Sequence, residues 1–217
     1  SGTGHAALPD PRAVDKSVPE YKNPFHPSTY AHFVARKDYR KTYDVYKDDT
    51  LLNRQPKKSR KIFVCLDEQR GQYLVDGLVA MDFPLSSGVK AYPTKTGDYA
   101  VISKKEDHTS NLYGKMYDAE GKCINYNAES TDPIPEGGRF DGSPMPYWQR
   151  LTNAGLGLHV GKVRRHPVSH GCVRLPRNVA EILYRQTSIG TPVTIQKTPL
   201  PVPEAQKIPP AQQQESG

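Results

Sequence analysis

The sequence has few hydrophobic residues and no long apolar run. Hydrophobic residues make up 35% of the 217 residues, and there is a single Trp. No stretch approaches the roughly 18 consecutive apolar residues that a membrane-spanning helix requires, so we expect no transmembrane segment. The opening Ser1-Gly2-Thr3-Gly4 does not resemble a secretory signal peptide. The low apolar content predicts one packed domain flanked by polar ends.

Cysteine is also scarce. The three cysteines, Cys65, Cys123 and Cys172, are too few for a disulfide-bonded scaffold. If two of them form a disulfide, the natural pair is Cys65 with Cys123; otherwise both are expected to be small buried hydrophobic residues. In either case Cys172 is left as the free thiol.

Positive charge is in excess, with 30 Lys and Arg against 23 Asp and Glu and a net charge of +7. Such a balance favours an anionic partner, although it also suits an ordinary solvated surface. The sequence contains no basic strand interleaved with aromatic residues and no zinc-finger spacing. We therefore expect no nucleic acid partner.

The two ends of the chain are polar and rich in proline. Residues 1–60 form an N-terminal extension that we expect to be partly disordered, with a helix over 28–46 capped by Ser28 or Thr29. Residues 198–217 are rich in Pro and Gln and lack an apolar period, which predicts a disordered or extended tail.

Between these ends, residues 61–197 have the pattern of a mainly β domain. An Asp76-Gly77 dipeptide between two apolar runs predicts a hairpin, and the apolar spacing after Pro176 predicts a short amphipathic helix. Residues 104–145 are rich in Asp, Gly, Pro and Ser, and we expect a long loop there that acts as a lid or a binding loop. The strands are expected at 62–66, 72–75, 78–83, 98–102, 155–160 and 191–195.

The segment from Gly157 to Pro176 contains the reactive side chains. Three of the seven histidines and one of the three cysteines fall within it. A thiol is only a few per cent ionised at neutral pH, and a nearby imidazole can take its proton to create a nucleophile. Gly171 allows close backbone approach, and the amides of Gly171 and Cys172 can face a developing oxyanion. These parts suit acyl transfer through a thioester.

A zinc site is the competing interpretation, because imidazole and thiolate are good zinc ligands. Its ligands would be His159, His166, His170 and Cys172. The spacing lacks the paired ligands of a structural zinc site, and residues 170 and 172 point to opposite faces of an extended chain. The residue types alone leave both interpretations open.

The run Ser169-His170-Gly171-Cys172-Val173-Arg174-Leu175 resembles the signature of the L,D-transpeptidase family, also called the YkuD domain, in the Ser-His-Gly-Cys-x-Arg form typical of Gram-negative enzymes. Other segments agree with this family in order along the chain. His159 lies where the family has its upstream histidine. The remaining matches are Met145-Pro146-Tyr147-Trp148 and Pro93-Thr94-Lys95-Thr96-Gly97-Asp98-Tyr99.

The resemblance implies a role for each residue of the segment. Cys172 would be the nucleophile, His159 its general base, and the Val160 carbonyl the group that orients the imidazole. The Gly171 and Cys172 amides would form the oxyanion hole. Residues expected to shape the site or hold substrate are Ser169, His170, Arg174, Tyr147 and Trp148, and His166 is expected to be a solvent-facing loop residue.

The resemblance also implies a β-sandwich or barrel with the cysteine at a cleft, and an enzyme that needs no metal or organic cofactor. Its substrates would be peptidoglycan stem peptides, with a second stem peptide or a wall-anchored protein as acyl acceptor. The protein would be exported to the periplasm or cell envelope. Two alternatives stay open: the same thioester resolved by water, and a wall-binding module without activity.

Overall fold

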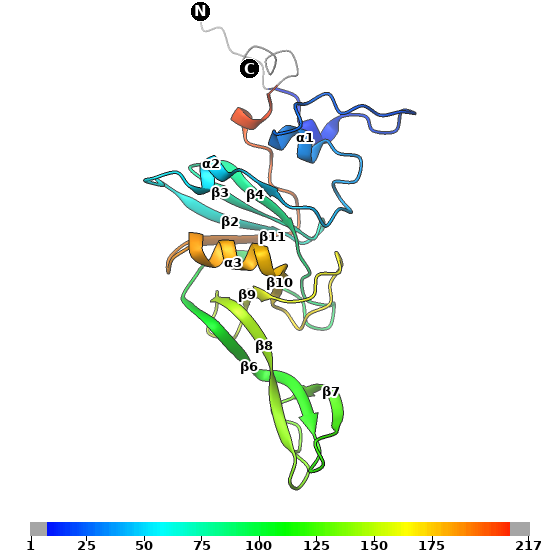
Figure 1. Ribbon diagram of the computed structural model, residues 1–217, viewed down its shortest axis with the longest axis vertical. Helices are drawn as coiled ribbons and strands as arrows, with labels where there is room; N and C mark the ends of the chain where they lie inside the picture. The colour runs from blue at the N-terminus through cyan, green and yellow to red at the C-terminus, as the bar shows by residue number, and fades with distance from the viewer. Residues whose placement is uncertain (1–7, 209–217) are drawn as a thin grey trace, which may run out of the picture.

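The structure is a computed structural model that describes residues 8–208. It is mainly β, with two sheets stacked along the long axis of the molecule and few helices (Figure 1). The predicted fold class is therefore confirmed. No helix within residues 8–208 is long and apolar enough to cross a membrane.

The first sheet has six strands in the order β1-β4-β3-β2-β11-β5. The predicted hairpin is confirmed, since Asp76 and Gly77 both have positive φ angles, +52° and +80°, as a two-residue hairpin turn requires. β2 also pairs in parallel with β11, which brings the end of the domain back to its beginning. The bounds are β1 Tyr46–Lys47, β2 Arg60–Cys65, β3 Arg70–Val75, β4 Leu78–Pro84, β5 Gly97–Ala100 and β11 Pro192–Gln196.

The second sheet has five strands in the order β10-β9-β8-β6-β7. Its long strands β6 and β8 extend together with β7 into an arm that projects away from the rest of the molecule (Figure 1). The bounds are β6 Ser103–Tyr117, β7 Cys123–Glu129, β8 Arg139–Arg150, β9 Gly157–Val160 and β10 Val173–Leu175.

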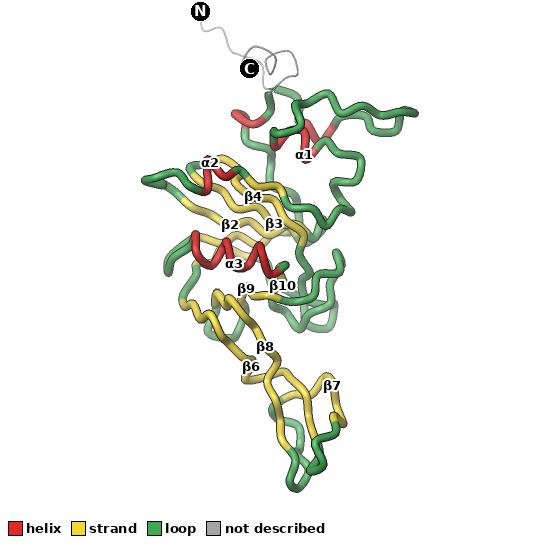
Figure 2. Tube along the Cα trace, in the orientation of Figure 1, coloured by secondary structure: helices red, strands yellow, loops and turns green. Residues whose placement is uncertain are grey.

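The prediction of a loop over residues 104–145 is wrong. Most of that segment belongs to β6, β7 and β8, as the yellow tube of the arm in Figure 2 shows. The sequence hides these strands because most side chains of β6 and β7 are at least partly exposed, and the few buried ones, such as Met116 and Ala128, do not form an alternating apolar pattern. Backbone pairing between β6 and β8 holds the arm instead of a buried face.

The predicted helix after Pro176 is confirmed as α3, Arg177–Gln186, which lies between the two sheets (Figure 1). Its buried residues Val179, Ala180 and Leu183 recur at helical spacing and join one hydrophobic core with strands of both sheets. The helix thereby connects the six-stranded sheet to the strands that position Cys172.

The helix predicted over residues 28–46 is confirmed only at its start. α1 spans Tyr30–Val34, and the Thr29 side chain accepts a hydrogen bond from the His32 amide as its cap. Beyond Ala35 the chain turns, since Tyr39 continues inward to the sheet, where its hydroxyl donates to Asp82 at 2.8 Å. A tertiary contact therefore outweighs the loose helical period.

Asp82 of β4 fastens the N-terminal segment to the first sheet. Its carboxylate forms a fully buried ion pair with Arg70 at 2.6 Å and also accepts hydrogen bonds from Tyr30 and Gln72. The Arg70 guanidinium in turn donates to the carbonyls of Thr42 and Asp44 and faces the rings of Phe33 and Tyr39. Hydrogen bonds to both Asp82 and Arg70 therefore offset the cost of burying the two charges, as a stable buried ion pair requires.

Residues before and after the predicted domain of residues 61–197 also pack against it. β1 pairs with β4, and Leu51 and Leu52 of α2, Asp49–Leu52, join the main core. In the tail, the side chain of Gln206 hydrogen-bonds both backbone groups of Val79. Short 3-10 helices occur at Pro11–Ala13 and Glu204–Gln206. Residues 1–7 and 209–217, parts of the predicted disordered ends, lie outside the described residues.

The three cysteines are free. Cys65 is buried at the end of β2, as the second interpretation predicts, and its thiol donates to the Lys197 carbonyl. Cys123 begins β7 in the other sheet and is partly exposed, so the prediction that it is buried is wrong. The alternative pairing of these two residues is therefore absent from the structure.

Candidate active site

Parallel pairing of β9 with β10 places three polar side chains on one face of the second sheet. Val173 lies opposite Leu158 and Leu175 opposite Val160, while Arg174 lies directly opposite His159. The buried Val173, Leu175 and Leu158 take the core face, so the alternating residues His159, Arg174 and Cys172 share the other face. All three line one cavity of about 700 Å³.

His159 is buried, with 5% of its surface exposed. Its Nδ1 lies 2.7 Å from the Val160 carbonyl oxygen, an acceptor, so Nδ1 carries the proton and Nε2 is the free base. Burial, the largest effect, and the charges of Arg174 and His108 together lower the pKa of His159 to about 4. The hydrogen bond to the Val160 carbonyl raises the pKa but does not outweigh these effects. The imidazole is therefore neutral at neutral pH and able to accept a proton.

Cys172 is partly exposed, and its Sγ donates to the Gly155 carbonyl at 3.2 Å. Burial raises the pKa of the Cys172 thiol above its ordinary value, while the Gly157 amide and the charges of Arg150 and Arg174 oppose this rise. At neutral pH the cavity is therefore lined by Cys172 as a thiol and by His159 as a neutral imidazole, rather than by a preformed thiolate–imidazolium pair.

The turn that carries Cys172 is fastened by hydroxyl groups. Ser169 Oγ donates to the Cys172 carbonyl at 2.5 Å and accepts from the Gly171 amide at 3.1 Å. Thr94 Oγ1 donates to the Gly171 carbonyl at 2.6 Å and accepts from the Gly88 amide. Gly171 has φ +125°, a conformation that residues with a side chain rarely adopt. The turn therefore has one well-defined geometry.

This geometry changes the predicted oxyanion hole. The Gly171 amide is not free, because Ser169 already accepts its hydrogen bond. Within the described part of the chain, the Cys172 amide has no acceptor and is the available donor.

The mouth of the cavity has an aromatic rim. The ring of His170, which is exposed, stacks on Tyr113 of β6 at 4.4 Å between centroids, and Tyr92 lies 4.9 Å from it on a second side. His170 and Tyr113 line the cavity itself, whereas Tyr92 does not. The arm that carries Tyr113 therefore supplies one wall of the site.

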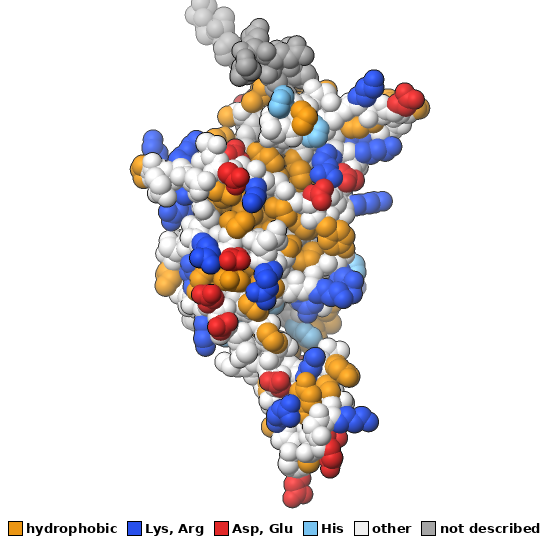
Figure 3. All heavy atoms as spheres, in the orientation of Figure 1, with side chains coloured by type: hydrophobic (Ala, Val, Ile, Leu, Met, Phe, Trp, Pro, Cys, Tyr) orange, Lys and Arg blue, Asp and Glu red, His pale blue; other side chains and the backbone are white. Residues whose placement is uncertain are grey.

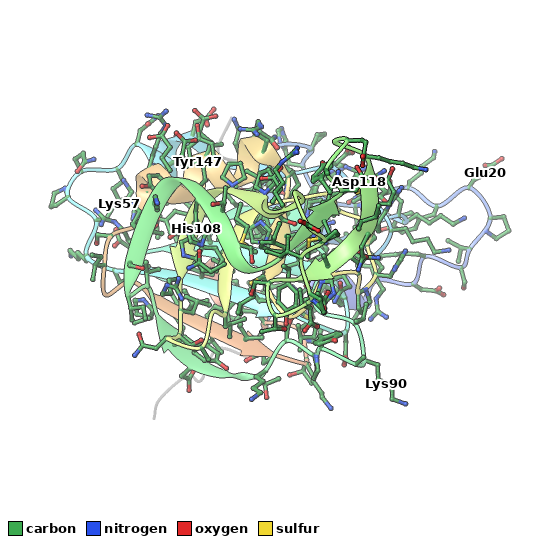
Figure 4. All side chains as sticks on the ribbon, turned by 90° about the horizontal axis from the view of Figure 1, so that it is seen from below. Glu20, Lys57, Lys90, His108, Asp118 and Tyr147 are labelled. Carbon is green, nitrogen blue, oxygen red and sulfur yellow. The ribbon has the colours of Figure 1, made fainter. Side chains whose placement is uncertain are left out.

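Trp148 supplies part of the cavity wall beside His159, with ring centroids 6.0 Å apart, and His108 stacks on its other side at 4.8 Å. Tyr147 does not line the cavity and instead packs against Tyr184 of α3. In Figure 4, Tyr147 lies on the α3 side of the curved ribbon of β6 and β8, whereas His108 lies beneath that ribbon. The structure thus separates two neighbours that the sequence analysis assigned together.

The ligands of the zinc interpretation do not converge. His166 is exposed on the connection before Ser169, and His170 stacks on a tyrosine. Among residues 8–208 no group of three or more His, Cys, Asp and Glu side chains is placed to hold a metal ion.

Several residues around the site were missed by the sequence analysis. Thr94 lies in the Pro93–Gly97 turn that supports the family resemblance, so its role as a fastening hydroxyl had a sequence signal. His108 and Tyr113 lie in the segment predicted to be a loop, and Gly155 and Arg150 carry no motif. Only the pairing of the strands brings these four to Cys172.

The chain is similar to known proteins of one family. Residues 59–195 match the model of the YkuD family, the L,D-transpeptidase catalytic domain. Over 121 residues the chain is 31% identical to a probable L,D-transpeptidase 3 of Mycobacterium tuberculosis strain H37Rv, covering 52% of this chain and 38% of that protein.

Solved structures show the same fold. An L,D-transpeptidase from Mycobacterium smegmatis is similar with a TM-score of 0.50 and 22% identity, covering 64% of this chain and 58% of that one. An LD transpeptidase solved in complex with imipenem has a TM-score of 0.50 and 19% identity, covering 64% and 59%. The chain thus spans less than two thirds of the length of these relatives. Because the family match covers more than half of the sequence, including the second sheet and the cavity around Cys172, this chain belongs to the YkuD family of L,D-transpeptidase catalytic domains.

Proposed function

We propose that this protein is a cysteine peptidyltransferase that acts on peptidoglycan stem peptides. The observation that carries the proposal is the shared cavity of Cys172 and His159, in which the Val160 carbonyl holds the imidazole with Nε2 as its free base. A cavity of about 700 Å³ has room for a peptide segment. The family to which the chain belongs supports the reaction class.

In the first half of the reaction, Cys172 Sγ attacks the carbonyl of the amide between the L-centre of a diamino acid and a terminal D-alanine. The thiol proton passes to His159 Nε2, and the new oxyanion accepts a hydrogen bond from the Cys172 amide. The Gly171 amide would join it by exchanging its present acceptor, Ser169 Oγ. His159 then protonates the departing amine, the C–N bond breaks, and a thioester remains on Cys172.

In the second half, an amine attacks the thioester and gives its proton to His159. The C–S bond breaks, and His159 returns the proton to the sulfur. The acceptor is a second stem peptide or a wall-anchored protein. A stem peptide bound against the rings of His170 and Tyr113 would cover the thioester from water, which favours an amine acceptor. We place the enzyme in the periplasm or cell envelope, where its substrate is.

The test is incubation with purified disaccharide tetrapeptide, followed by mass spectrometry of the products. Transpeptidation predicts cross-linked dimers that have lost one D-alanine. Shortened monomers alone would identify the same thioester as an intermediate of hydrolysis. If Cys172→Ala still forms either product, the proposed chemistry is wrong.

A further inference from the structure

A second cavity lies between the N-terminal segment and the turn from β2 to β3. Its volume is about 600 Å³, and none of its lining residues lines the cavity of Cys172. Six of its nine lining residues are basic: Arg12, Lys16, Arg36, Lys37, Arg40 and Lys41. In Figure 3, basic and acidic side chains are interspersed over the visible face of this end of the molecule.

Part of this positive charge is not neutralised by the protein. Arg36 forms ion pairs with Asp38 and Asp44 at 2.9 and 2.8 Å. Lys37 and Lys41, in contrast, have no side-chain hydrogen bond or ion pair within residues 8–208, and both are exposed. Their charges are therefore available to an anion at the mouth of the cavity.

The wall of the cavity contains an unsatisfied acceptor. The Glu68 side chain is only 6% exposed, its Oε1 is 3.8 Å from the Arg40 guanidinium, and Arg40 itself is 80% exposed. Glu68 Oε2 is buried and accepts no hydrogen bond from the described residues, and the Arg12 Nε donor is likewise unused. Because Oε2 is closed to solvent, the carboxylate oxygen that a ligand hydroxyl can reach is Oε1, which faces Arg40 without a hydrogen bond.

The wall around Glu68 is held in place by Arg165, which lies on the connection between β9 and Cys172. Arg165 Nη1 donates to the carbonyls of Glu68 and Gln69 at 3.0 and 2.7 Å, and Nη2 contacts the Arg40 carbonyl. These bonds join three separate segments around the cavity. The cavity is therefore a built feature of the fold and not a gap in a loop.

We propose that this cavity binds a phosphorylated polyol or sugar. The phosphate would lie against Lys37, Arg40 and Lys41, and a ligand hydroxyl would donate to Glu68 Oε1. The site lies at the end of the molecule opposite the β6–β8 arm (Figure 1), so a bound envelope polymer or headgroup leaves the cavity of Cys172 open. Glycerol phosphate is the simplest group with both features, and it occurs in soluble polymers and in lipid headgroups alike.

The first experiment is calorimetric titration of the full chain with glycerol 3-phosphate, inorganic phosphate and glycerol. Glycerol 3-phosphate should bind more tightly than either of the others. Lys37→Gln/Lys41→Gln should raise its Kd at least about fivefold, since two exposed charge contacts are lost. Lys58→Gln/Lys122→Gln removes two exposed lysines that line neither cavity and should leave the Kd unchanged.

Glu68→Ala separates the two parts of the site. It removes the unpaired carboxylate, so binding of inorganic phosphate should not weaken, while the preference for glycerol 3-phosphate over inorganic phosphate should disappear. Co-sedimentation with vesicles of equal parts phosphatidylglycerol and phosphatidylcholine then identifies the source. Binding that depends on Lys37 and Lys41 indicates a lipid headgroup, and binding of soluble glycerol 3-phosphate alone indicates a polymer.

Absence of binding to every probe, or equal losses in both double variants, would overturn the proposal. Acyl transfer by Cys172 should be unchanged in all three variants, since none of these residues lines its cavity. A failure here is therefore distinguishable from a failure of the proposed transferase activity.

Discussion

Replacing His159 by glutamine should change how the stability of the protein depends on pH. The buried imidazole has its pKa lowered from 6.5 to about 4, so the folded state binds fewer protons than the unfolded state between these values. Stability is therefore lost as the pH falls from about 6.5 towards 4 and is fully present above that window. Since His159 is only 5% exposed, solvent screening removes little of this effect.

The magnitude follows from the two pKa values. At about pH 5 the unfolded imidazole is almost fully protonated and the folded one almost fully neutral, which costs the wild type about 2 kcal/mol relative to pH 8. Urea unfolding at both pH values measures this loss. The variant lacks the titrating group, so the difference in unfolding free energy between wild type and His159→Gln should change by about 2 kcal/mol.

His166→Gln removes an exposed histidine and serves as the control for deleting an imidazole. Other groups contribute equally to wild type and variant and cancel in the difference. If the unfolding free energy of His159→Gln depended on pH in the same way as that of the wild type or of the control, the buried neutral imidazole would be refuted.

Three further predictions concern the scaffold and the turn. Asp82→Ala leaves Arg70 buried without its partner and should lower the unfolding free energy by about 3–5 kcal/mol; a loss below about 1 kcal/mol in urea unfolding would contradict this. Gly171→Ala forces a side chain onto a backbone with φ +125°, so the rate of acyl transfer should fall strongly while the melting temperature falls only slightly. Thr94→Val removes the hydroxyl that fastens the same turn, so kcat should fall while the fold is kept; unchanged kcat would refute a positioning role.

The sequence predicts the first sheet and α3 because their side chains meet the core. Runs such as Ile62–Leu66 and the Asp76-Gly77 turn carry an apolar period and a turn signal, which the structure bears out. The arm has turn residues but no apolar period, since its strands are stabilised by pairing with each other. The prediction of a helix beyond Ala35 fails for another reason. Tyr39 donates a hydrogen bond to the buried carboxylate of Asp82, which lies far along the chain, and no local apolar period encodes that contact.

The residues of the site likewise fall into those that the sequence identifies and those whose placement depends on the fold. Cys172 lies in the Ser169–Leu175 motif, His159 and Val160 lie upstream of it, and all three line one cavity. The hydrogen bond that engages the Gly171 amide, the stacking of His170 on Tyr113 and the position of Tyr147 against α3 all depend on contacts between distant segments. A motif identifies reactive residues, whereas the orientation of their donors requires the fold.

Cys172 should form a covalent acyl intermediate. Intact-protein mass spectrometry after incubation with a carbapenem detects such an intermediate, because the drug acylates the nucleophile and stays attached. We expect one adduct on the wild type, localised to the peptide that contains Cys172, and none on Cys172→Ala, whose free Cys65 and Cys123 remain as internal controls. An adduct that persists in Cys172→Ala, or a wild type that gains no mass, would contradict it.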